Sequence, residues 1–313
     1  MIESVCRRLD GLPLAIELAA ARVAGLGVEE VARGVDDMLS VLVGGRRRAA
    51  RQATLRASIA WSFDLLAPPE RRLLAGLSVF AGGFTLDAAQ GVGADEIVPA
   101  HDIATEVAHL VDQSLVVADH LAAGTRYRLL DTIQAFAADE LAGAGRVDEV
   151  RDRHLAWYAR WSYAQATAPG NWTALQFSCS EVDNQRHAAQ WAILRQRPAA
   201  LAELLVDAVH GFASAQLSEA SHYLDVLRSS DSRLDAVGRD RLAFCQVALA
   251  MITGQFGDVP RVCEQQRLIA VDELMWTKFT FLLGFNSAWL APDRFDSVFI
   301  GAGVFWFIVL IQQ

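Results

Sequence analysis

The sequence has almost no lysine and few cysteines. Its 313 residues include one lysine, Lys278, and four widely separated cysteines, none in a C-x-x-C pair: Cys6, Cys179, Cys245 and Cys263. Without a histidine at ligand spacing, this pattern argues against a zinc-finger site, and we expect buried thiols in a reducing cytosol. The first residues also lack the basic and then apolar build of a signal peptide. We therefore expect a cytoplasmic protein.

The missing lysines also bear on enzymatic activity. A phosphate-binding loop of the type G-x-x-x-x-G-K-[ST] needs a lysine after a glycine-rich turn. Lys278 has no such approach, and no segment reads as a Walker B strand that ends in carboxylates. No Ser/His/Asp or Cys/His set carries a recognisable local signature either. The sequence therefore predicts no ATP hydrolysis and no other catalysis.

Positive charge is also scarce. The formal net charge is -9, with 53% hydrophobic and 21% charged residues. This composition is typical of a globular protein and argues against a dominant surface for nucleic acid or anionic membranes. The one basic cluster contains Arg46, Arg47, Arg48, Arg51 and Arg56. Because it follows Gly44-Gly45 and no aromatic residues interleave it, we interpret it as a solvated hinge.

Long apolar runs occur only near the end of the sequence. Residues 298–311 contain no charge, and residues 276–290 are nearly as apolar. A membrane-spanning helix needs about 20 apolar residues, so the final run is short. We expect a buried terminal hairpin or an out-of-register tail, with membrane attachment through 298–311 as the alternative.

An apolar helix with a defined start lies near the N-terminus. Pro13 suits the first position of a helix, where its fixed φ is already helical and its missing N–H costs nothing. From there to Ala24 only Glu17 and Arg22 are charged. The pattern predicts a helix that faces protein on most sides.

The segment Leu9–Arg22, with its Gly11-Leu12-Pro13-Leu14-Ala15 core, resembles the GLPLA motif of NB-ARC-type STAND ATPases, in the form found in actinobacterial LuxR-like and AfsR-like regulators. Further blocks that resemble this family follow in the expected order: Arg51–Arg56, Trp61–Leu66, Phe80–Ala89, Leu110–Val116, Arg126–Ile133 and Glu181–Arg186. The resemblance covers roughly residues 1 to 190 and lacks the half of the ATPase that carries the phosphate loop.

The resemblance implies a nucleotide-facing edge. It would place Leu12, Pro13 and Leu14 on the adenine side of bound ADP or ATP in an intact relative. Related proteins often carry a histidine that reaches the β-phosphate, at the position where this sequence has Leu130. We therefore assign no cofactor firmly to this chain alone, and expect the missing ATPase half as a partner.

These patterns predict a mainly α protein in four parts. They are a GLPLA-bearing helical subdomain (1–45), a winged-helix subdomain with a small two-stranded wing (46–146), TPR-like helical repeats (147–275) and an apolar C-terminal segment (276–313). In the winged helix, Thr54 and Thr85 are expected to cap helices and Pro68-Pro69 to end one. A further helix is expected over 101–113, and two strands over 114–118 and 126–130 around a turn at Gly124.

The third winged-helix helix is acidic. Residues 101–113 contain Asp102, Glu106 and Asp112 and no arginine or lysine, so an approach to DNA phosphates would be repulsive. We expect a packing module inside a switch rather than a DNA reader, and expect His101 and His109 to be surface or packing residues. DNA binding that depends on Arg126 or Arg128 is the alternative.

The repeat region is expected to recognise a protein partner or a signal. Helices are predicted over 148–163 and 181–194, with Trp157, Trp161 and Trp191 as packing residues. Residues 242–271 resemble one TPR-like helix pair. Taken together, the sequence predicts a truncated, non-catalytic part of a STAND-type transcriptional regulator. The alternatives are a DNA-binding winged-helix transcription factor and a membrane-attached interaction protein.

Overall fold

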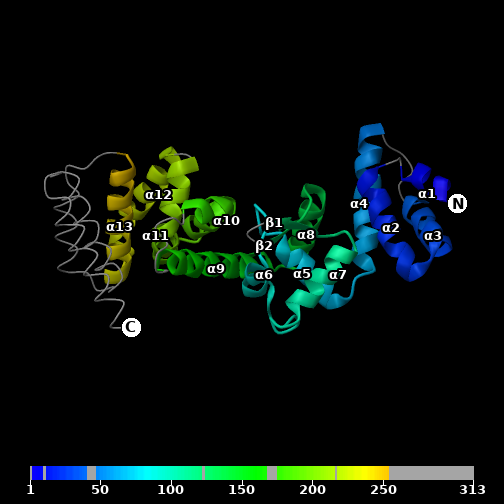
Figure 1. Cartoon of the computed structure of the whole chain (residues 1–313), viewed down its shortest axis with the longest axis horizontal. Coiled ribbons are helices and arrows are strands. Elements are labelled where there is room, and N and C mark those ends of the chain that lie inside the picture. The colour runs from blue at the N-terminus through cyan, green and yellow to red at the C-terminus, as the bar shows by residue number, and fades with distance from the viewer. Residues whose placement is uncertain are drawn as a thin grey trace. The chain divides into compact units, whose positions relative to one another are not determined.

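The computed structural model describes residues 2–9, 12–40, 47–121, 124–167, 175–215 and 217–253. This part is mainly helical with one two-stranded antiparallel sheet, which confirms the predicted fold class (Figure 1). The chain divides into two compact units, Met1–His154 and Leu155–Gln313. The boundary lies within helix α9 (Val147–Thr167). The division into four domains stays a prediction.

Four helices surround a small apolar core at the start of the first unit: α1 (Ile2–Arg8), α2 (Pro13–Leu26), α3 (Val28–Ser40) and α4 (Arg47–Asp64). Pro13 is the first residue of α2, as predicted. Only one face of α2 is buried, with Ala15, Leu18, Ala19 and Arg22, whereas Pro13, Glu17, Ala20 and Ala24 are exposed. The expectation that α2 is covered on most sides is therefore wrong within the described residues. Its exposed face consists largely of small side chains, which cost little in water.

Helix α4 begins earlier than the sequence suggested. Thr54 was expected at its N-cap, but the helix already runs from Arg47, and Thr54 is buried inside it with its carbonyl oxygen accepting a hydrogen bond from Ser58. Arginine, alanine and glutamine before Thr54 are good helix formers, so the helix continues upstream of the expected cap. Arg47 and Arg48 are therefore helical, and Gly44–Arg46 lie outside the described residues.

The winged helix consists of α5 (Pro68–Leu77), α6 (Leu86–Gly93), α7 (Ile103–Asp112) and α8 (Asp131–Gly143), with strands β1 (Val117–Leu121) and β2 (Gly124–Arg128). Pro68 and Pro69 occupy the first turn of α5, where proline is tolerated. Thr85 caps α6, because its Oγ1 accepts the N–H of Ala88 at 3.2 Å. Helix α5 packs against α6, α7 and α8.

The strands pair antiparallel from Val117 opposite Arg128 to Leu121 opposite Gly124. Phe84 adds a bridge to Tyr127 through two backbone hydrogen bonds of 2.7 and 2.8 Å. Gly83 precedes this bridge with φ +78°, and a Cβ there would lie 2.7 Å from the carbonyl oxygen of Tyr127. The close approach of the wing to the α5–α6 loop therefore depends on a glycine.

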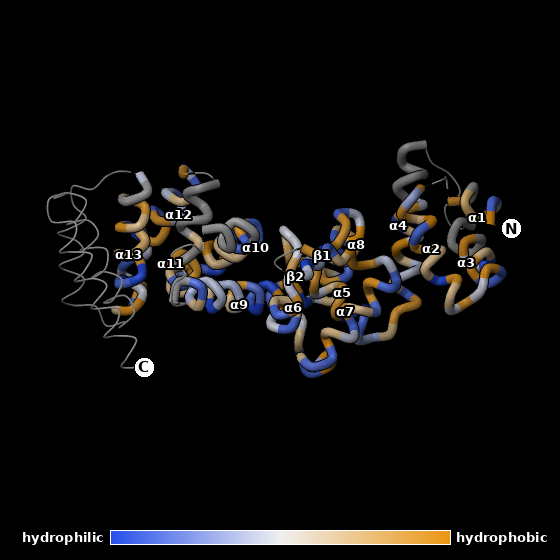
Figure 2. Tube along the Cα trace, viewed as in Figure 1, coloured by the Kyte–Doolittle hydropathy of each residue, from blue (hydrophilic) through white to orange (hydrophobic). Residues whose placement is uncertain are grey.

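The second unit contains most of α9, then α10 (Leu175–Leu194), α11 (Pro198–Ala215), α12 (Leu217–Ser229), a short 3-10 turn (Asp231–Arg233) and α13 (Ala236–Ile252). Helix α11 packs against α10, α12 and α13. Apolar and polar segments alternate along the helices of both units (Figure 2). Helix α10 begins at Leu175, so Glu181 lies inside it rather than at its start.

Several sequence predictions lie outside the described residues. They are the second helix of the TPR-like pair after residue 253 and the apolar segment 276–313, which includes the run 298–311. Among the helices that are described, none has the length and apolar character needed to cross a bilayer.

Candidate functional site

The residues assigned to the adenine side lie at the start of α2. Leu12 is the N-cap residue, half-buried against the core of α1 to α3, and Leu14 is also half-buried. Pro13 is exposed. Leu130, the residue at the family's histidine position, is the N-cap residue of α8 and half-buried. The adenine-side assignment of Leu12, Pro13 and Leu14 stays a prediction.

The exposed surface of α7 is the face that a winged helix would present to a DNA groove. Its exposed residues are Ala104, Thr105, Ala108, His109 and Asp112. Thr105 and His109 are the hydrogen-bond donors among them, no arginine or lysine is present, and Asp102 at the N-cap and Glu106 add negative charge.

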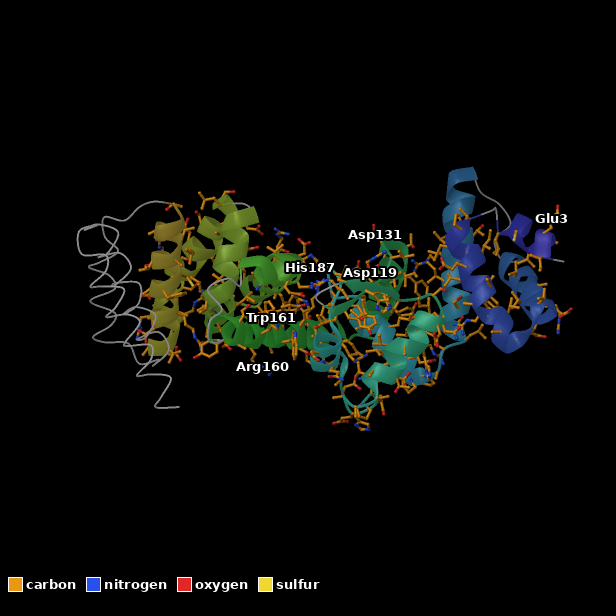
Figure 3. The ribbon with its side chains drawn as sticks, in the orientation of Figure 1. Glu3, Asp119, Asp131, Arg160, Trp161 and His187 are labelled. Carbon is orange, nitrogen blue, oxygen red and sulfur yellow. The ribbon has the colours of Figure 1, made fainter. Side chains whose placement is uncertain are left out.

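The arginines of the wing are held within the module. Arg126 donates from Nε (3.1 Å) and Nη2 (2.9 Å) to the carbonyl oxygen of Gly82. Arg128 forms an ion pair of 2.9 Å with Asp119 of β1, which Figure 3 labels on the wing. Arg126 therefore attaches the wing to the α5–α6 loop.

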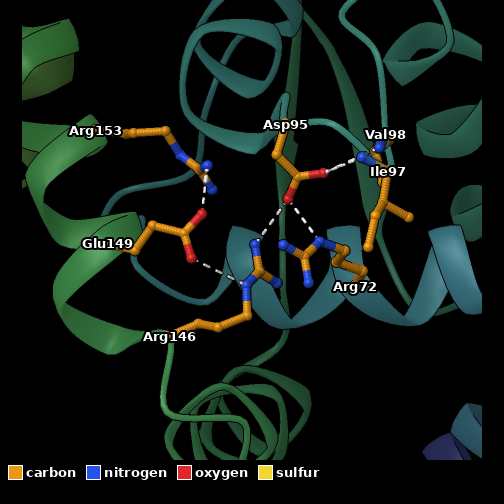
Figure 4. Close-up of polar contacts among 7 residues, drawn as sticks. All are labelled: Arg72, Asp95, Ile97, Val98, Arg146, Glu149 and Arg153. Carbon is orange, nitrogen blue, oxygen red and sulfur yellow. Dashed lines mark hydrogen bonds and ion pairs between the residues drawn. The ribbon is translucent and has the colours of Figure 1, made fainter.

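A carboxylate bridges three segments of the first unit (Figure 4). Asp95, in the α6–α7 loop, accepts hydrogen bonds from Arg72 of α5 at 2.6 Å and from Arg146, just before α9, at 2.9 Å. Its other oxygen accepts the backbone N–H groups of Ile97 and Val98. Burial opposes the charged carboxylate, but the bonds from Val98, Arg72 and Ile97 together hold the pKa of Asp95 below its ordinary value.

A second polar cluster joins α5 and α7. Glu70, Glu106 and His109 each present one ligand atom, and these atoms all lie within 4.8 Å of one another. Burial raises the pKa of Glu106, and the negative charge of Glu70 raises it further. His109 is exposed, as expected, but it lies beside two carboxylates, which the sequence analysis did not anticipate.

The family-like block Glu181–Arg186 links helices of the second unit. Glu181 is buried and accepts from Tyr158 of α9 at 2.8 Å and from Asn184 at 2.9 Å. Gln185 donates to Ser162 of α9 at 3.1 Å. The block therefore forms a buried polar seam between α9 and α10.

On another side of α10, Arg186 binds Glu219 of α12 with two hydrogen bonds, from Nε at 2.6 Å and from Nη2 at 2.9 Å, and also contacts Asp183. Tyr223 donates to the same glutamate at 3.1 Å. The Arg186 guanidinium lowers the pKa of Glu219, and burial raises the pKa of Tyr223. The sequence pattern gave no sign of this pairing, because Glu219 belongs to a different helix.

An open groove of about 660 Å³ lies beside this pairing, between α10 and α12. Arg186, Gln190, Glu219 and His222 supply polar groups, and Ile193 and Leu194 supply apolar surface. This volume is in the range of small-molecule sites. It is a candidate ligand or partner site in the described part of the second unit.

The aromatic residues of this unit have packing roles. Trp191 is buried, with the guanidinium of Arg195 5.3 Å from its ring centre. Trp161, labelled in Figure 3, meets Tyr158 edge to face at 6.2 Å. Both observations agree with the packing role expected from the sequence.

Comparisons with known proteins bear on the first unit most directly. The family model for the winged helix-turn-helix domain matches residues 66–142, from just before α5 almost to the end of α8. Two relatives, from Mycobacterium bovis and Mycobacterium tuberculosis, are provisionally named HTH-type transcriptional regulators. Each is 42% identical over 194 residues, which is 61% of this chain and 22% of the relative.

An uncharacterized Mycobacterium tuberculosis protein is 43% identical over 155 residues, which is 49% of this chain and 39% of that protein. The chain thus spans about a fifth of the length of the named regulators that it matches. It contains a winged helix-turn-helix domain and is homologous to part of these regulators.

Proposed function

We propose that this chain is a non-catalytic part of a STAND-type transcriptional regulator of the LuxR-like or AfsR-like kind, in which its winged helix packs within a switch. The observation that carries this proposal is the chemistry of the winged helix: α7 has no arginine or lysine, and the wing arginines bond within the module. The names of the mycobacterial relatives support a role in transcription.

In this proposal the start of α2 contributes the adenine side of a nucleotide site. Support comes from the resemblance to the GLPLA motif and from the exposure of Pro13 at the first turn. The phosphates would be held by the ATPase half of the whole regulator, since this sequence has no phosphate loop. Binding of ADP between the parts would then bias a two-state equilibrium.

The repeat region would receive the signal in the same proposal. Its groove between α10 and α12 combines exposed polar groups with apolar surface, as binding sites for small molecules or peptide segments do. Protein partners of the regulator would also dock on these helices.

A DNA-reading winged helix is the second candidate, and the family model for a winged helix-turn-helix domain favours it. The test is fluorescence anisotropy of a labelled random-sequence duplex with the full chain at low and at physiological salt. We expect no binding, because α7 repels phosphates. Salt-dependent binding that is lost in Arg128→Ala would overturn the packing role and support DNA reading.

The nucleotide part is tested separately by thermal melting with and without Mg-ADP. A ligand that binds only the folded state raises the midpoint. For this chain alone we expect a cooperative melt without a shift, because the phosphate contacts are absent from its sequence. A shift that disappears in Pro13→Ala would show instead that the base pocket works without the ATPase half.

A further inference from the structure

Two glutamates and a histidine converge at the contact of α5 with α7. We propose that Glu70, Glu106 and His109 form a binding site for a divalent transition-metal ion of the Zn²⁺ type. The proposal does not depend on the function proposed above. It rests on helical spacing, on the separation of the ligand atoms and on the chemistry of the three side chains.

The spacing on α7 suits metal binding. Glu106 and His109 are three residues apart, so a carboxylate and an imidazole lie on the same side of the helix. A Glu-x-x-His pair on one helix with a glutamate from a neighbouring helix corresponds to half of the ligand set of helical di-iron proteins. Here the neighbouring helix is α5, which packs against α7 and supplies Glu70.

Glu70 is already held in position. Its Oε2 accepts the backbone N–H of Ala67 at 2.6 Å, which fixes the side chain at the start of α5. Its Oε1 lies 3.5 Å from Nδ1 of His109. Tetrahedral ligands at about 2.1 Å from zinc are about 3.4 Å from one another. Two of the three ligand atoms therefore already have the separation that zinc requires, and Glu106 completes the set with a small side-chain movement.

The charges at this contact favour a cation. Glu70 and Glu106 bring two carboxylates together, the Glu70 side chain is only 15% exposed, and Asp102 adds negative charge nearby. Burial, then Glu70 and Asp102, raise the pKa of Glu106, while His109 opposes the shift. Arg22 interacts electrostatically with Glu70, but its Nη2 donates its hydrogen bond to the carbonyl oxygen of Ser62. A dication would neutralise both carboxylates.

The donor set selects the metal. An imidazole nitrogen with two carboxylates suits zinc and its neighbours, whereas Mg²⁺ and Ca²⁺ prefer oxygen ligands only. Three protein ligands also leave a position for water. A bound ion would link α5 to α7 and neutralise one carboxylate on each helix, Glu70 of α5 and Glu106 of the acidic α7. The electrostatic character of this face would then depend on the metal.

The test is isothermal titration of the full chain with Zn²⁺ after chelator treatment, in buffer with a non-thiol reductant. We expect one site whose affinity falls at least tenfold in Glu106→Gln and in His109→Gln. His101→Gln removes an exposed histidine from the turn before the same helix and should bind as the wild type does. Mg²⁺ should give no heat at the same concentrations.

Two controls make the result decisive. Co²⁺ in place of Zn²⁺ should give visible absorption bands that change in His109→Gln, which reports directly on the imidazole. Glu106→Gln removes a like-charge contact, so its metal-free melting midpoint should equal or exceed that of the wild type, and lost binding cannot then be ascribed to unfolding. Unchanged Zn²⁺ affinity in the Glu106→Gln/His109→Gln double variant, or no binding by the wild type, would overturn the proposal.

Discussion

The carboxylate of Asp95 lies 2.9 Å from Nη2 of Arg146, a residue 51 positions later in the sequence. The Asp95 side chain is only 8% exposed and that of Arg146 12%. The bond joins the α6–α7 loop of the winged helix to the segment that leads into α9. It has little solvent screening, so it should contribute more than a surface ion pair does.

Replacing Asp95 should therefore destabilise the first unit. Asp95→Asn removes the buried charge that two partly buried guanidinium groups share, and we expect a loss of about 3 kcal/mol in the free energy of unfolding. Asp119→Asn, at the exposed ion pair with Arg128, should cost less than about 1 kcal/mol. Urea unfolding of both variants checks the difference, and equal losses would contradict it.

The same carboxylate predicts an acid limit to stability. Because its pKa is lower in the folded state than in the unfolded state, its contribution is complete above the unfolded pKa of about 3.9. The contribution is lost as the pH falls through the folded pKa. Unfolding at a series of pH values should show the wild type and Asp95→Asn converging only below about pH 4. Convergence already at pH 6 would refute this account.

The two-bond pairing of Arg186 with Glu219 should require arginine. Lysine cannot make two parallel hydrogen bonds to a carboxylate, so Arg186→Lys should lower the stability of the second unit by about 1 to 2 kcal/mol. Arg228→Lys is the matched control, since Arg228 and Asp225 form a single exposed contact within α12. Thermal melting should show a clear drop for the first variant and almost none for the second.

Glu106→Gln should stabilise the metal-free protein at neutral pH. Because the pKa of Glu106 is raised in the folded state, its charge begins to oppose folding as the pH rises above the unfolded pKa of about 4.3, and the full penalty is reached above the folded pKa. We expect a gain of about 0.5 kcal/mol at pH 7, the scale of a like-charge contact on a helix surface. The gain should vanish below about pH 3, where the carboxyl is protonated in both states. A loss of stability at pH 7 would show that Glu106 has a favourable partner.

Gly83→Ala should weaken the attachment of the wing. The residue has φ +78°, and the new Cβ would lie 2.7 Å from the backbone oxygen of Tyr127. We expect a loss of about 2 kcal/mol or more. Gly143→Ala, where a Cβ meets nothing within 4 Å, should be close to neutral. Hydrogen exchange of Phe84 and Tyr127 amides would show whether the loss is local to the wing.

Sequence reasoning succeeded where one residue determines the local backbone. Pro13 has no N–H to donate and therefore fits the first turn of α2, and Thr85 caps α6 through its own hydroxyl. The wing was also predicted, although the first strand begins three residues later than expected and the second begins two residues earlier. Boundaries are less certain than elements, because neighbouring residues have similar propensities. The residues before Thr54 also favour a helix, which explains why α4 begins upstream of the expected cap.

The candidate sites were harder to predict, because each depends on contacts between distant residues. Glu106 and His109 have a ligand-like spacing in the sequence, but only the packing of α5 on α7 brings Glu70 to them. Asp95 and Arg146 likewise meet only after the winged helix has folded. Glu181 was expected to begin a helix, yet it lies inside α10, where Tyr158 and Asn184 donate hydrogen bonds to its buried carboxylate. Pairings of this kind can be identified only once the tertiary structure is known.

The seam of Glu181 and Gln185 restricts how α10 can turn about its own axis. Leucine and alanine contacts tolerate small rotations of a helix, because apolar packing has no preferred direction. Hydrogen bonds are directional, and a turn of one residue, about 100°, would move Glu181 away from Tyr158 and bring charged Asp183 toward the interior. Each buried group left without its bond would cost about 1 to 3 kcal/mol. The buried seam therefore fixes the rotation of α10 about its axis. The same orientation directs Arg186 toward Glu219.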